Sequence, residues 1–429
     1  RFPVSATTMA FTTRAIPESR VAVIGGSIAG CAAAIALKRA GVQQVDVFER
    51  SSANDLADRG LGIGLPSPIF QQLVEQDILD ADMRYVETEK RYWYLKNDSV
   101  TGKKCYENPM KVQLHNWGLL WNQLRKRVED SSYHSGVTVD MAQSKIHQGS
   151  PASVELFSDQ QSLGEYDFCI QAEGALAAGL EENKAKYAGY VLWRGSFPVK
   201  DHPQILDLTD MPETFFTSVY ENGHSIFYLM PTVSLERDGE YLLNYAIYTR
   251  TPPALEGKYL YKATRAGQIT PEQLGFLDKT ALSQMPARFK DMVSISIQEG
   301  GISIHPILDR IPKSFSTLDG LGLLLGDAGA VLRPHTASGT TKAIMEALLL
   351  QKLIQEPNAT WQSVSEAYQT DRDDDAKVKV ALGERLGRAQ VLETPDWQNM
   401  EAADFDEWLA AQVAGSGNYM YKGLKTHQK

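Results

Sequence analysis

Cysteine is scarce in this chain of 429 residues: only Cys31, Cys105 and Cys169 occur, far apart and without a C-x-x-C pair or a histidine at a metal-binding spacing. We therefore expect reduced, packed thiols, and neither a disulfide framework nor a metal site. The sequence also lacks a run of about 18 apolar residues and a charged start followed by an apolar core, so no membrane span or secretion signal is expected. A cytoplasmic protein is the default expectation.

An excess of positive charge is missing as well. The 43 basic and 53 acidic residues give a net charge of -10, which argues against nucleic acid or an anionic membrane as the main partner. With 43% apolar and 22% charged residues, the composition is that of an ordinary globular protein, and the length suffices for two or three domains. Residues 1–19 are polar and irregular, and we expect them to form a disordered lead.

Residues 20–49 have the pattern of a compact βαβ unit. A buried strand runs into the tight turn GGSIAG at residues 25–30, an alanine-rich helix follows, and a second strand ends at Glu49. This is a dinucleotide fingerprint, in which glycines let the backbone approach a pyrophosphate and an acid about 20 residues later accepts from ribose hydroxyls. Ser27 replaces the middle glycine and is small enough to keep that approach. The acid favours FAD or NAD over NADP at this first site.

A second strand, turn and helix pattern covers residues 321–350. The apolar run stops at Asp327, a polar turn carries Pro334 and His335, and a helix begins near Ser338 and Gly339. A carboxylate just past a strand end can bond a sugar-like diol, and the free N–H groups of a helix start favour negative charge. Gly339 lets the backbone approach a flat ring closely.

The remaining patterns are coarser. The glycine-dense residues 59–64 suit either a backbone lying flat on a planar ligand or a flexible loop, and residues 186–297 are β-rich and aromatic. We expect residues 84–96 to be strand-like, residues 294–297 to form a strand, and a helix over 361–390 to be interrupted by the charged run 371–375.

Taken in order, these motifs resemble the class A flavoprotein aromatic hydroxylases, whose fold is that of p-hydroxybenzoate hydroxylase. The resemblance covers about residues 20–390 and rests on GGSIAG with Glu49, on the strand ending in Glu173-Gly174, and on Gly326-Asp327-Ala328 before a glycine-opened helix. The segments YAGYVLWRG, LLNYAIYTR and RPHTASGTTKA are most similar to the 2,6-dihydroxypyridine 3-hydroxylase branch.

The resemblance implies an α/β fold with a Rossmann-like FAD-binding domain of the p-hydroxybenzoate hydroxylase type. We expect this domain over residues 20–183 and 299–360, an inserted β-sheet substrate-binding domain over 184–298 together with strand 84–96, and a C-terminal helical region over 361–429. The implied enzyme is an FAD-dependent, NAD(P)H-using monooxygenase. It would hydroxylate an electron-rich aromatic or heteroaromatic ring with O2, through a C4a-hydroperoxyflavin, and it could be a homodimer.

Site residues follow from the same resemblance. The implied cofactor-binding residues are Gly25, Gly26, Ser27, Ile28, Ala29, Gly30, Glu49, Arg50, Arg59, Gly62, Arg125, Glu173, Asp327, Ser338, Gly339 and Thr340. The predicted catalytic residues are His335, Pro334 and Arg194; His335 is the first candidate for a base that removes a ring proton, followed by His224 and His305. The predicted substrate contacts are Tyr190, Trp193, Tyr228, Tyr245 and His224.

Three departures from the family pattern keep alternatives open: Ser27 in the turn, Glu173 in place of aspartate, and Gly329-Ala330 in place of alanine-histidine. They suggest a non-catalytic FAD-binding scaffold as the rival from another class. Within the fold, the alternatives are a flavin epoxidase and a Baeyer–Villiger-type monooxygenase. The sequence has no Trp-x-Trp-x-Ile-Pro stretch of the kind that flavin halogenases carry.

Overall fold

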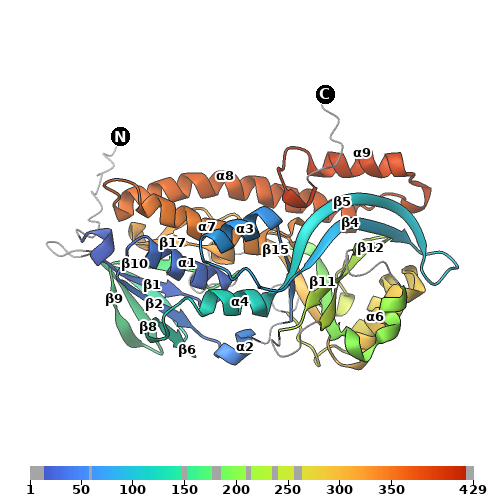
Figure 1. Cartoon of the computed structure of the whole chain (residues 1–429), viewed down its shortest axis with the longest axis horizontal. Coiled ribbons are helices and arrows are strands. Elements are labelled where there is room, and N and C mark those ends of the chain that lie inside the picture. Colours follow the sequence, from blue (N-terminus) through green and yellow to red (C-terminus); the bar gives the residue numbers. More distant parts are fainter. Residues whose placement is uncertain are drawn as a thin grey trace.

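The computed structural model describes residues 14–57, 60–146, 152–175, 185–208, 214–233, 240–255 and 263–421. Two sheets lie toward opposite ends of an elongated molecule, and the long helix α8 (Trp361–Gly387) runs along one side (Figure 1). Across the described ranges we find no helix with the length and apolarity that a bilayer crossing needs.

The first sheet has six strands in the order β16-β17-β10-β1-β2-β6. Their bounds are Ser316–Thr317, Gly322–Leu324, Phe168–Gln171, Arg20–Ile24, Gln44–Glu49 and Tyr133–Ser135, and only β16 is antiparallel to its neighbour. Helices α1 (Ile28–Arg39), α4 (Trp117–Arg125) and α7 (Gly339–Ile354) share a hydrophobic core with it. A smaller antiparallel sheet of β7 (Met141–Lys145), β8 (Ser153–Ser158) and β9 (Gln161–Tyr166) contributes to a second core. Because both faces of the six-stranded sheet are covered, its parallel strands are apolar along nearly their whole sequence.

The second sheet has eight strands in the order β15-β11-β14-β13-β12-β4-β5-β3. Their bounds are Ser303–Asp309, Lys186–Pro198, Tyr241–Arg250, Gly223–Pro231, Thr214–Tyr220, Val86–Leu95, Lys103–Asn116 and Gly62–Leu65. Strands β3, β5 and β15 come from outside the predicted range 184–298 and complete this sheet. One of its faces packs with helices α5 (Pro271–Thr280) and α6 (Ala287–Gln298). The remaining helices are α2 (Ala53–Ala57), α3 (Ser67–Glu75) and α9 (Ala402–Val413).

Three local expectations need correction. The strand expected over residues 294–297 is the end of α6, whose buried side chains at 289, 292, 293 and 296 have helical spacing. Helix α8 is not interrupted by its charged run, because pairs three or four residues apart, such as Lys379 with Asp375 at 2.6 Å, neutralise much of it. Residues 14–19, expected within the irregular lead, are ordered: Ile16 is buried in a 3-10 turn, Ile16–Glu18.

Candidate active site

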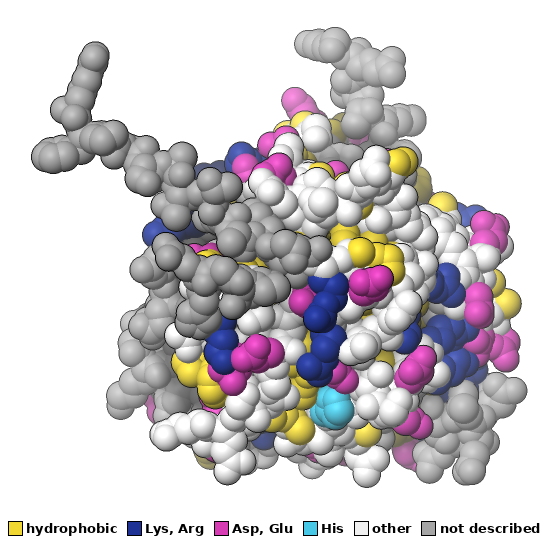
Figure 2. Space-filling view, turned by 90° about the vertical axis from the view of Figure 1, so that its left-hand side faces the viewer, with side chains coloured by type: hydrophobic (Ala, Val, Ile, Leu, Met, Phe, Trp, Pro, Cys, Tyr) yellow, Lys and Arg dark blue, Asp and Glu magenta, His cyan; other side chains and the backbone are white. Residues whose placement is uncertain are grey.

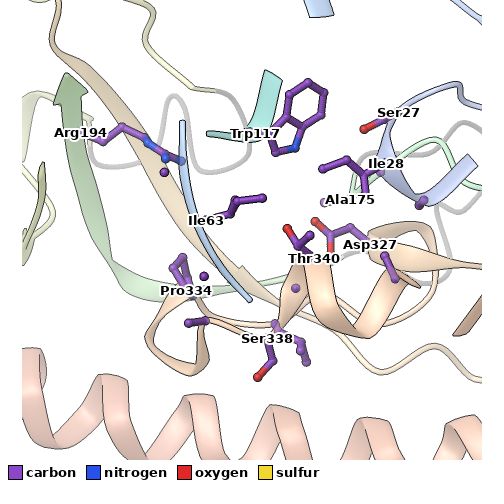
Figure 3. Close-up of a pocket in the computed structure, with 18 of the residues that line it drawn as sticks. Ser27, Ile28, Ile63, Trp117, Ala175, Arg194, Asp327, Pro334, Ser338 and Thr340 are labelled. Atoms are coloured by element: carbon purple, nitrogen blue, oxygen red, sulfur yellow. The ribbon is translucent and has the colours of Figure 1, made fainter. Parts of the chain in front are cut away.

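A cavity of about 850 Å³ lies between the two sheets and takes its walls from both. That volume is in the upper part of the range for small-molecule and cofactor sites. Figure 3 shows Ser27, Ile28 and Asp327 on one side of it and the Arg194 side chain reaching in from the opposite side, with Ile63 and Trp117 between them. The cavity therefore joins the two predicted motifs to the wall of the second sheet.

The GGSIAG turn is closely packed. Gly25 has a φ of 97°, and a Cβ there would come within 2.5 Å of the Ala172 carbonyl oxygen. A Cβ at Gly30 would collide with the Gly25 carbonyl oxygen, and one at Gly26 would collide with the Tyr133 ring. Gly26 and Gly30 do not line the cavity; they let strand, turn and helix approach one another.

Glu49 is buried, yet it lines the cavity beside this turn. The backbone N–H of Gly26 donates to one carboxylate oxygen at 2.7 Å and that of Ser51 donates to the other at 2.8 Å. These two bonds fix the carboxylate and leave further acceptor positions on each oxygen. The arrangement suits a carboxylate that receives hydrogen bonds from a ribose.

Asp327 is exposed to the cavity, while the turn beneath it is held by a buried ion pair on α7. Glu346 accepts from the Gly326 N–H at 2.7 Å, and the Lys342 ammonium donates to the Gly326 carbonyl at 2.8 Å and to Glu346 at 3.2 Å. On the other side of the turn, the Arg310 guanidinium donates to the backbone carbonyl of Asp327 at 2.7 Å. We call Lys342 and Glu346 the turn clamp.

The loop between Pro334 and α7 is held in place by hydrogen bonds from the segment that follows α9. Ala337 has a φ of 48°, a left-handed conformation that is unfavourable for alanine. Asn418 donates to the carbonyl of Thr336 at 2.9 Å, and the Tyr419 hydroxyl donates to that of Ala337 at 2.9 Å. A Cβ added at Gly339 would meet nothing within 4 Å, so the start of α7 is open to close approach by a flat ligand.

Successive side chains of a strand point to opposite faces of the sheet, so every second residue of the second sheet faces the cavity. Side chains of one face line the cavity: Leu192 and Arg194 of β11, His224, Ile226 and Tyr228 of β13, and Asn244, Ala246 and Tyr248 of β14. Trp193 and Tyr245 lie on the opposite face, within the hydrophobic core under α6. This corrects their expected place in the pocket wall.

His335 lies in a stacked group of rings at the end of this wall. Its ring centroid is 4.3 Å from that of Tyr248, which stacks in turn on His224 at 4.6 Å. Burial lowers the pKa of His335 well below its usual value and that of His224 to about 3, and the positive charge of Arg91 acts in the same direction. Both imidazoles are therefore neutral at physiological pH.

His335 has one hydrogen-bond partner among the described residues. Tyr190, buried behind it and outside the cavity wall, has its hydroxyl 2.8 Å from His335 Nε2. Nδ1, the other ring nitrogen, is buried and has no partner among the described residues. A base acting on a substrate ring through His335 would therefore involve the side joined to Tyr190 or a movement of the imidazole, and this catalytic role stays a prediction.

Two arginines belong to the same wall. The Arg194 guanidinium makes no hydrogen bond or ion pair with any described residue, and burial lowers its pKa without deprotonating it. Arg91, 3% exposed, donates from Nε to Thr217 at 2.7 Å and lies 4.0 Å above the Trp93 ring. Its guanidinium also lies 5.5 Å from the Phe215 ring centroid and interacts with the Tyr421 hydroxyl, and it has no carboxylate partner among the described residues.

The other predicted residues can now be placed. The cavity wall contains Gly25, Ser27, Ile28, Ala29, Glu49, Arg50, Gly62, Glu173, Asp327, Ser338, Gly339 and Thr340 of the predicted cofactor set, and Pro334, His335, Arg194, His224 and Tyr228 of the catalytic and substrate sets. Arg125 does not line it; its guanidinium donates to the Val128 carbonyl at 2.8 Å and pairs with Asp130 at 2.7 Å. His305 is also absent from the wall, and Arg59 lies outside the described residues.

Sequence reasoning missed several wall residues, notably Arg91, Trp117, Tyr248 and Tyr421. Tyr248 could have been found, because in a strand it shares a face with Asn244 and Ala246 and not with Tyr245. Arg91 and Tyr421 carry no local signal: they meet through tertiary structure, across 330 residues of chain.

Comparison with known proteins agrees with this geometry. The family model for squalene epoxidase matches residues 259–386. The 2,6-dihydroxypyridine 3-monooxygenase of Paenarthrobacter nicotinovorans is 26% identical over 347 residues, which cover 78% of this chain and 82% of that protein.

Two solved structures have a similar fold. The 2,6-dihydroxypyridine-3-hydroxylase from Arthrobacter nicotinovorans has a TM-score of 0.72 and 21% identity over 89% of this chain and 95% of its own. Klebsiella pneumoniae HpxO, complexed with FAD and uric acid, has a TM-score of 0.68 and 17% identity over 91% of this chain and 92% of its own. The predicted fold class is confirmed: in sequence and in fold, this chain is similar to FAD-dependent aromatic hydroxylases, and the predicted FAD cofactor and enzyme class agree with these proteins.

Proposed function

We propose that the protein is an FAD-dependent, NAD(P)H-using monooxygenase that hydroxylates a heteroaromatic or other electron-rich aromatic ring. The observation that carries this proposal is the continuity of one cavity. It extends from the GGSIAG turn and Asp327 past the start of α7 to a wall of buried rings and arginines, so that a flavin and a ring substrate fit end to end.

The residues on the first half suit FAD. Gly25 and Ser27 line the cavity where a pyrophosphate would lie, Glu49 faces the position of a ribose, and Asp327 faces that of a ribityl chain. The unpaired N–H groups at the start of α7, next to Ser338 and Gly339, favour the negative charge of a reduced flavin ring. When bound, FAD supplies electron transfer from NAD(P)H and the activation of O2.

The residues of the second half bind and orient the ring and exclude water. Phe215, Ile226 and Ala246 provide apolar surface, and Tyr248 provides a flat wall backed by His224. Tyr228 lines the cavity beside Asn244, and burial raises the pKa of its hydroxyl to about 12, so the hydroxyl stays protonated and can donate to a ligand. A dry pocket of this kind strengthens each polar contact to the substrate and protects a reactive oxygen adduct from water.

The first test is anaerobic reduction of the purified, yellow protein by NADPH and by NADH, with and without a panel of phenols, hydroxypyridines and indoles. We expect one class of ring to accelerate flavin bleaching by about two orders of magnitude or more, with hydroxylated product formed once air is admitted. Flavin that is absent, or bound but never reduced, would favour the non-catalytic scaffold.

The squalene epoxidase match does not shift the proposal toward epoxidation. The matched residues 259–386 contain the Asp327 turn, α7 and most of α8, which belong to the flavin side, whereas the ring wall on β11, β13 and β14 lies outside them. Two finer expectations also belong to this proposal: a cytoplasmic location, to be tested by cell fractionation, and a homodimer, to be tested by light scattering.

A further inference from the structure

Helix α8 ends in a π-helical turn, Arg388–Leu392, beside the ring end of the cavity, the part walled by the eight-stranded sheet. The N–H of Glu393 donates to the Arg388 carbonyl, five residues back, at 2.8 Å. This geometry is rare and occurs mostly as single turns at functional sites. Gln390, in the middle of the turn, lines the cavity. The turn therefore brings a polar side chain to the wall on which the ring is proposed to lie.

The π-helical turn is held firmly against the strands of that wall. Val391 is buried in one cluster with Tyr190, and the Arg250 guanidinium donates to the Leu392 carbonyl at 2.7 Å. A Cβ at Gly387, the last residue of α8, would collide with the Tyr190 hydroxyl, so glycine lets the helix end approach the sheet this closely. The position of the glutamine between these anchors is therefore fixed.

The side chain of Gln390 has no partner within the described part of the chain. The residue is 1% exposed, yet its amide group makes no hydrogen bond with a described residue. The amide nitrogen and oxygen are not wholly enclosed by protein atoms, so they reach the open space of the cavity. Buried polar groups are normally paired, because an unpaired one destabilises the fold. A ligand in the cavity is the partner that this arrangement leaves for the amide.

His224, on strand β13, adds a hydrogen-bond acceptor next to the same turn. Its Nδ1 lies 3.4 Å from the backbone carbonyl oxygen of Gln390, which can only accept, so Nδ1 carries a hydrogen. Burial lowers the pKa of His224 to about 3, so the ring is neutral and Nε2 keeps its lone pair. Nε2 also has no partner among the described residues and is not wholly enclosed.

These groups suit a particular kind of ring edge. A glutamine amide forms a pair of hydrogen bonds with a partner that has a donor and an acceptor side by side, as it does with adenine. In an oxygenated ring, that edge is a ring N–H next to a C=O, which is the lactam form of a hydroxylated nitrogen heterocycle. A carbocyclic phenol lacks the ring N–H and can form only one of the two bonds.

We propose that Gln390 selects the substrate: its amide binds the N–H and C=O edge of a cyclic amide, and His224 Nε2 accepts a further hydrogen bond from the ring. Gln390 would thus be a specificity-determining residue that favours nitrogen heterocycles over phenols. This deepens, and rests on, the proposed function, because it assigns a substrate class to the same cavity.

The surface does not provide this selection. The chain carries a net charge of -10, and on the face at the nucleotide end, where the six-stranded sheet lies, basic and acidic side chains are interspersed (Figure 2). Attraction by charge cannot distinguish two uncharged rings that differ in one nitrogen atom. That distinction needs hydrogen bonds inside the cavity, where each of them is stronger than in water.

The test measures binding to the oxidised holoenzyme by the change in flavin absorbance, with two pairs of rings that differ in one ring nitrogen. 2,6-Dihydroxypyridine is paired with resorcinol, and 6-hydroxynicotinate is paired with 4-hydroxybenzoate. We expect the heterocycle of at least one pair to bind about tenfold tighter or more than its carbocyclic counterpart.

Variants decide whether the amide is responsible. Gln390→Met keeps the length of the side chain but cannot form the paired bonds, so it should weaken binding of the preferred heterocycle by about tenfold or more and leave the carbocycle within about threefold. The matched control Gln362→Met, at an exposed position on the same helix, should keep the preference. Urea unfolding of ligand-free Gln390→Met should show equal or higher stability, because the variant removes an unpaired buried amide.

Several results would overturn the proposal. These are equal or tighter binding of the carbocycle in both pairs, no binding of either heterocycle up to about 10 mM, or an unchanged preference in Gln390→Met. The last result would assign the preference to the greater acidity of the heterocycle. Because binding needs no turnover, the two ideas fail separately. A protein that shows the preference but never bleaches loses the proposed function alone, and one that hydroxylates phenols and hydroxypyridines equally well loses the role of Gln390 alone.

Discussion

The turn clamp gives the most demanding prediction. Lys342 and Glu346 have side-chain exposures of 0% and 2%, and together they hold both backbone groups of Gly326, the residue before Asp327. Glu346→Gln leaves the Lys342 ammonium buried without its counter-charge, with a second cation, Arg372, 3.8 Å from the lost carboxylate oxygen. Breaking such a pair costs about 3–5 kcal/mol, a large part of the 5–15 kcal/mol that typically stabilises a domain.

Urea unfolding of the FAD-saturated protein, together with the flavin content after gel filtration, checks this. The matched control is Glu356→Gln, at an exposed position just after the same helix, which should change stability by no more than about 0.5 kcal/mol. A loss below about 1 kcal/mol in Glu346→Gln, with normal flavin content, would refute the reasoning.

A double variant separates the ion pair from its hold on the backbone. Lys342→Met with Glu346→Leu removes both charges, so the cost of an unpaired ammonium disappears. The N–H of Gly326 then loses its partner, which costs about 1–3 kcal/mol, whereas its C=O keeps the hydrogen bond from the Gly329 N–H at 3.1 Å. We expect the double variant to regain part of the stability but to stay poor in flavin; full flavin would show that the clamp does not position Asp327.

Four further outcomes are expected. Asp327→Ala should fold but bind FAD about 10- to 100-fold more weakly, measured by flavin fluorescence, whereas Gly30→Ala should lose both stability and flavin because its methyl group collides with the Gly25 carbonyl. His335→Ala should keep FAD but waste NAD(P)H as peroxide; unchanged coupling would remove His335 from the substrate site. His115, whose pKa burial lowers to about 3, binds its proton only in the unfolded chain between about pH 6.5 and 3. Stability is therefore lost as pH falls through that window, and His115→Phe should reduce the slope by about 1.4 kcal/mol per pH unit.

The parallel half of the molecule was predictable because its signals are local. The GGSIAG turn, Glu49 and Asp327 each follow directly from the strand before them, and parallel strands bring their carboxyl ends to one edge. The wall of the second sheet was predictable only in kind. Residues 186–297 were expected to be β-rich and aromatic, but the alternation of side chains along a strand defines two faces and does not say which one faces the ligand.

The strand expected over residues 294–297 shows the same limit. Four alternating residues, Ser-Ile-Ser-Ile, fit a period of two, while the longer window from Phe289 onward fits a helix. The proximity of Arg91 and Tyr421 could not be predicted from any short stretch of sequence, because only the folded chain brings strand β4 against the segment after α9.

The contacts of Asn418 and Tyr419 with the loop before α7 have a consequence for biosynthesis. Strands near residues 20, 170 and 322 can pair once about three quarters of the chain has left the ribosome, so the nucleotide end can assemble early. The ring end cannot, since Tyr421 and the hydroxyl that supports Ala337 are made nearly a hundred residues later. A chain released before residue 418 would hold a cofactor site with an open wall, where reduced flavin meets water and oxygen without a substrate.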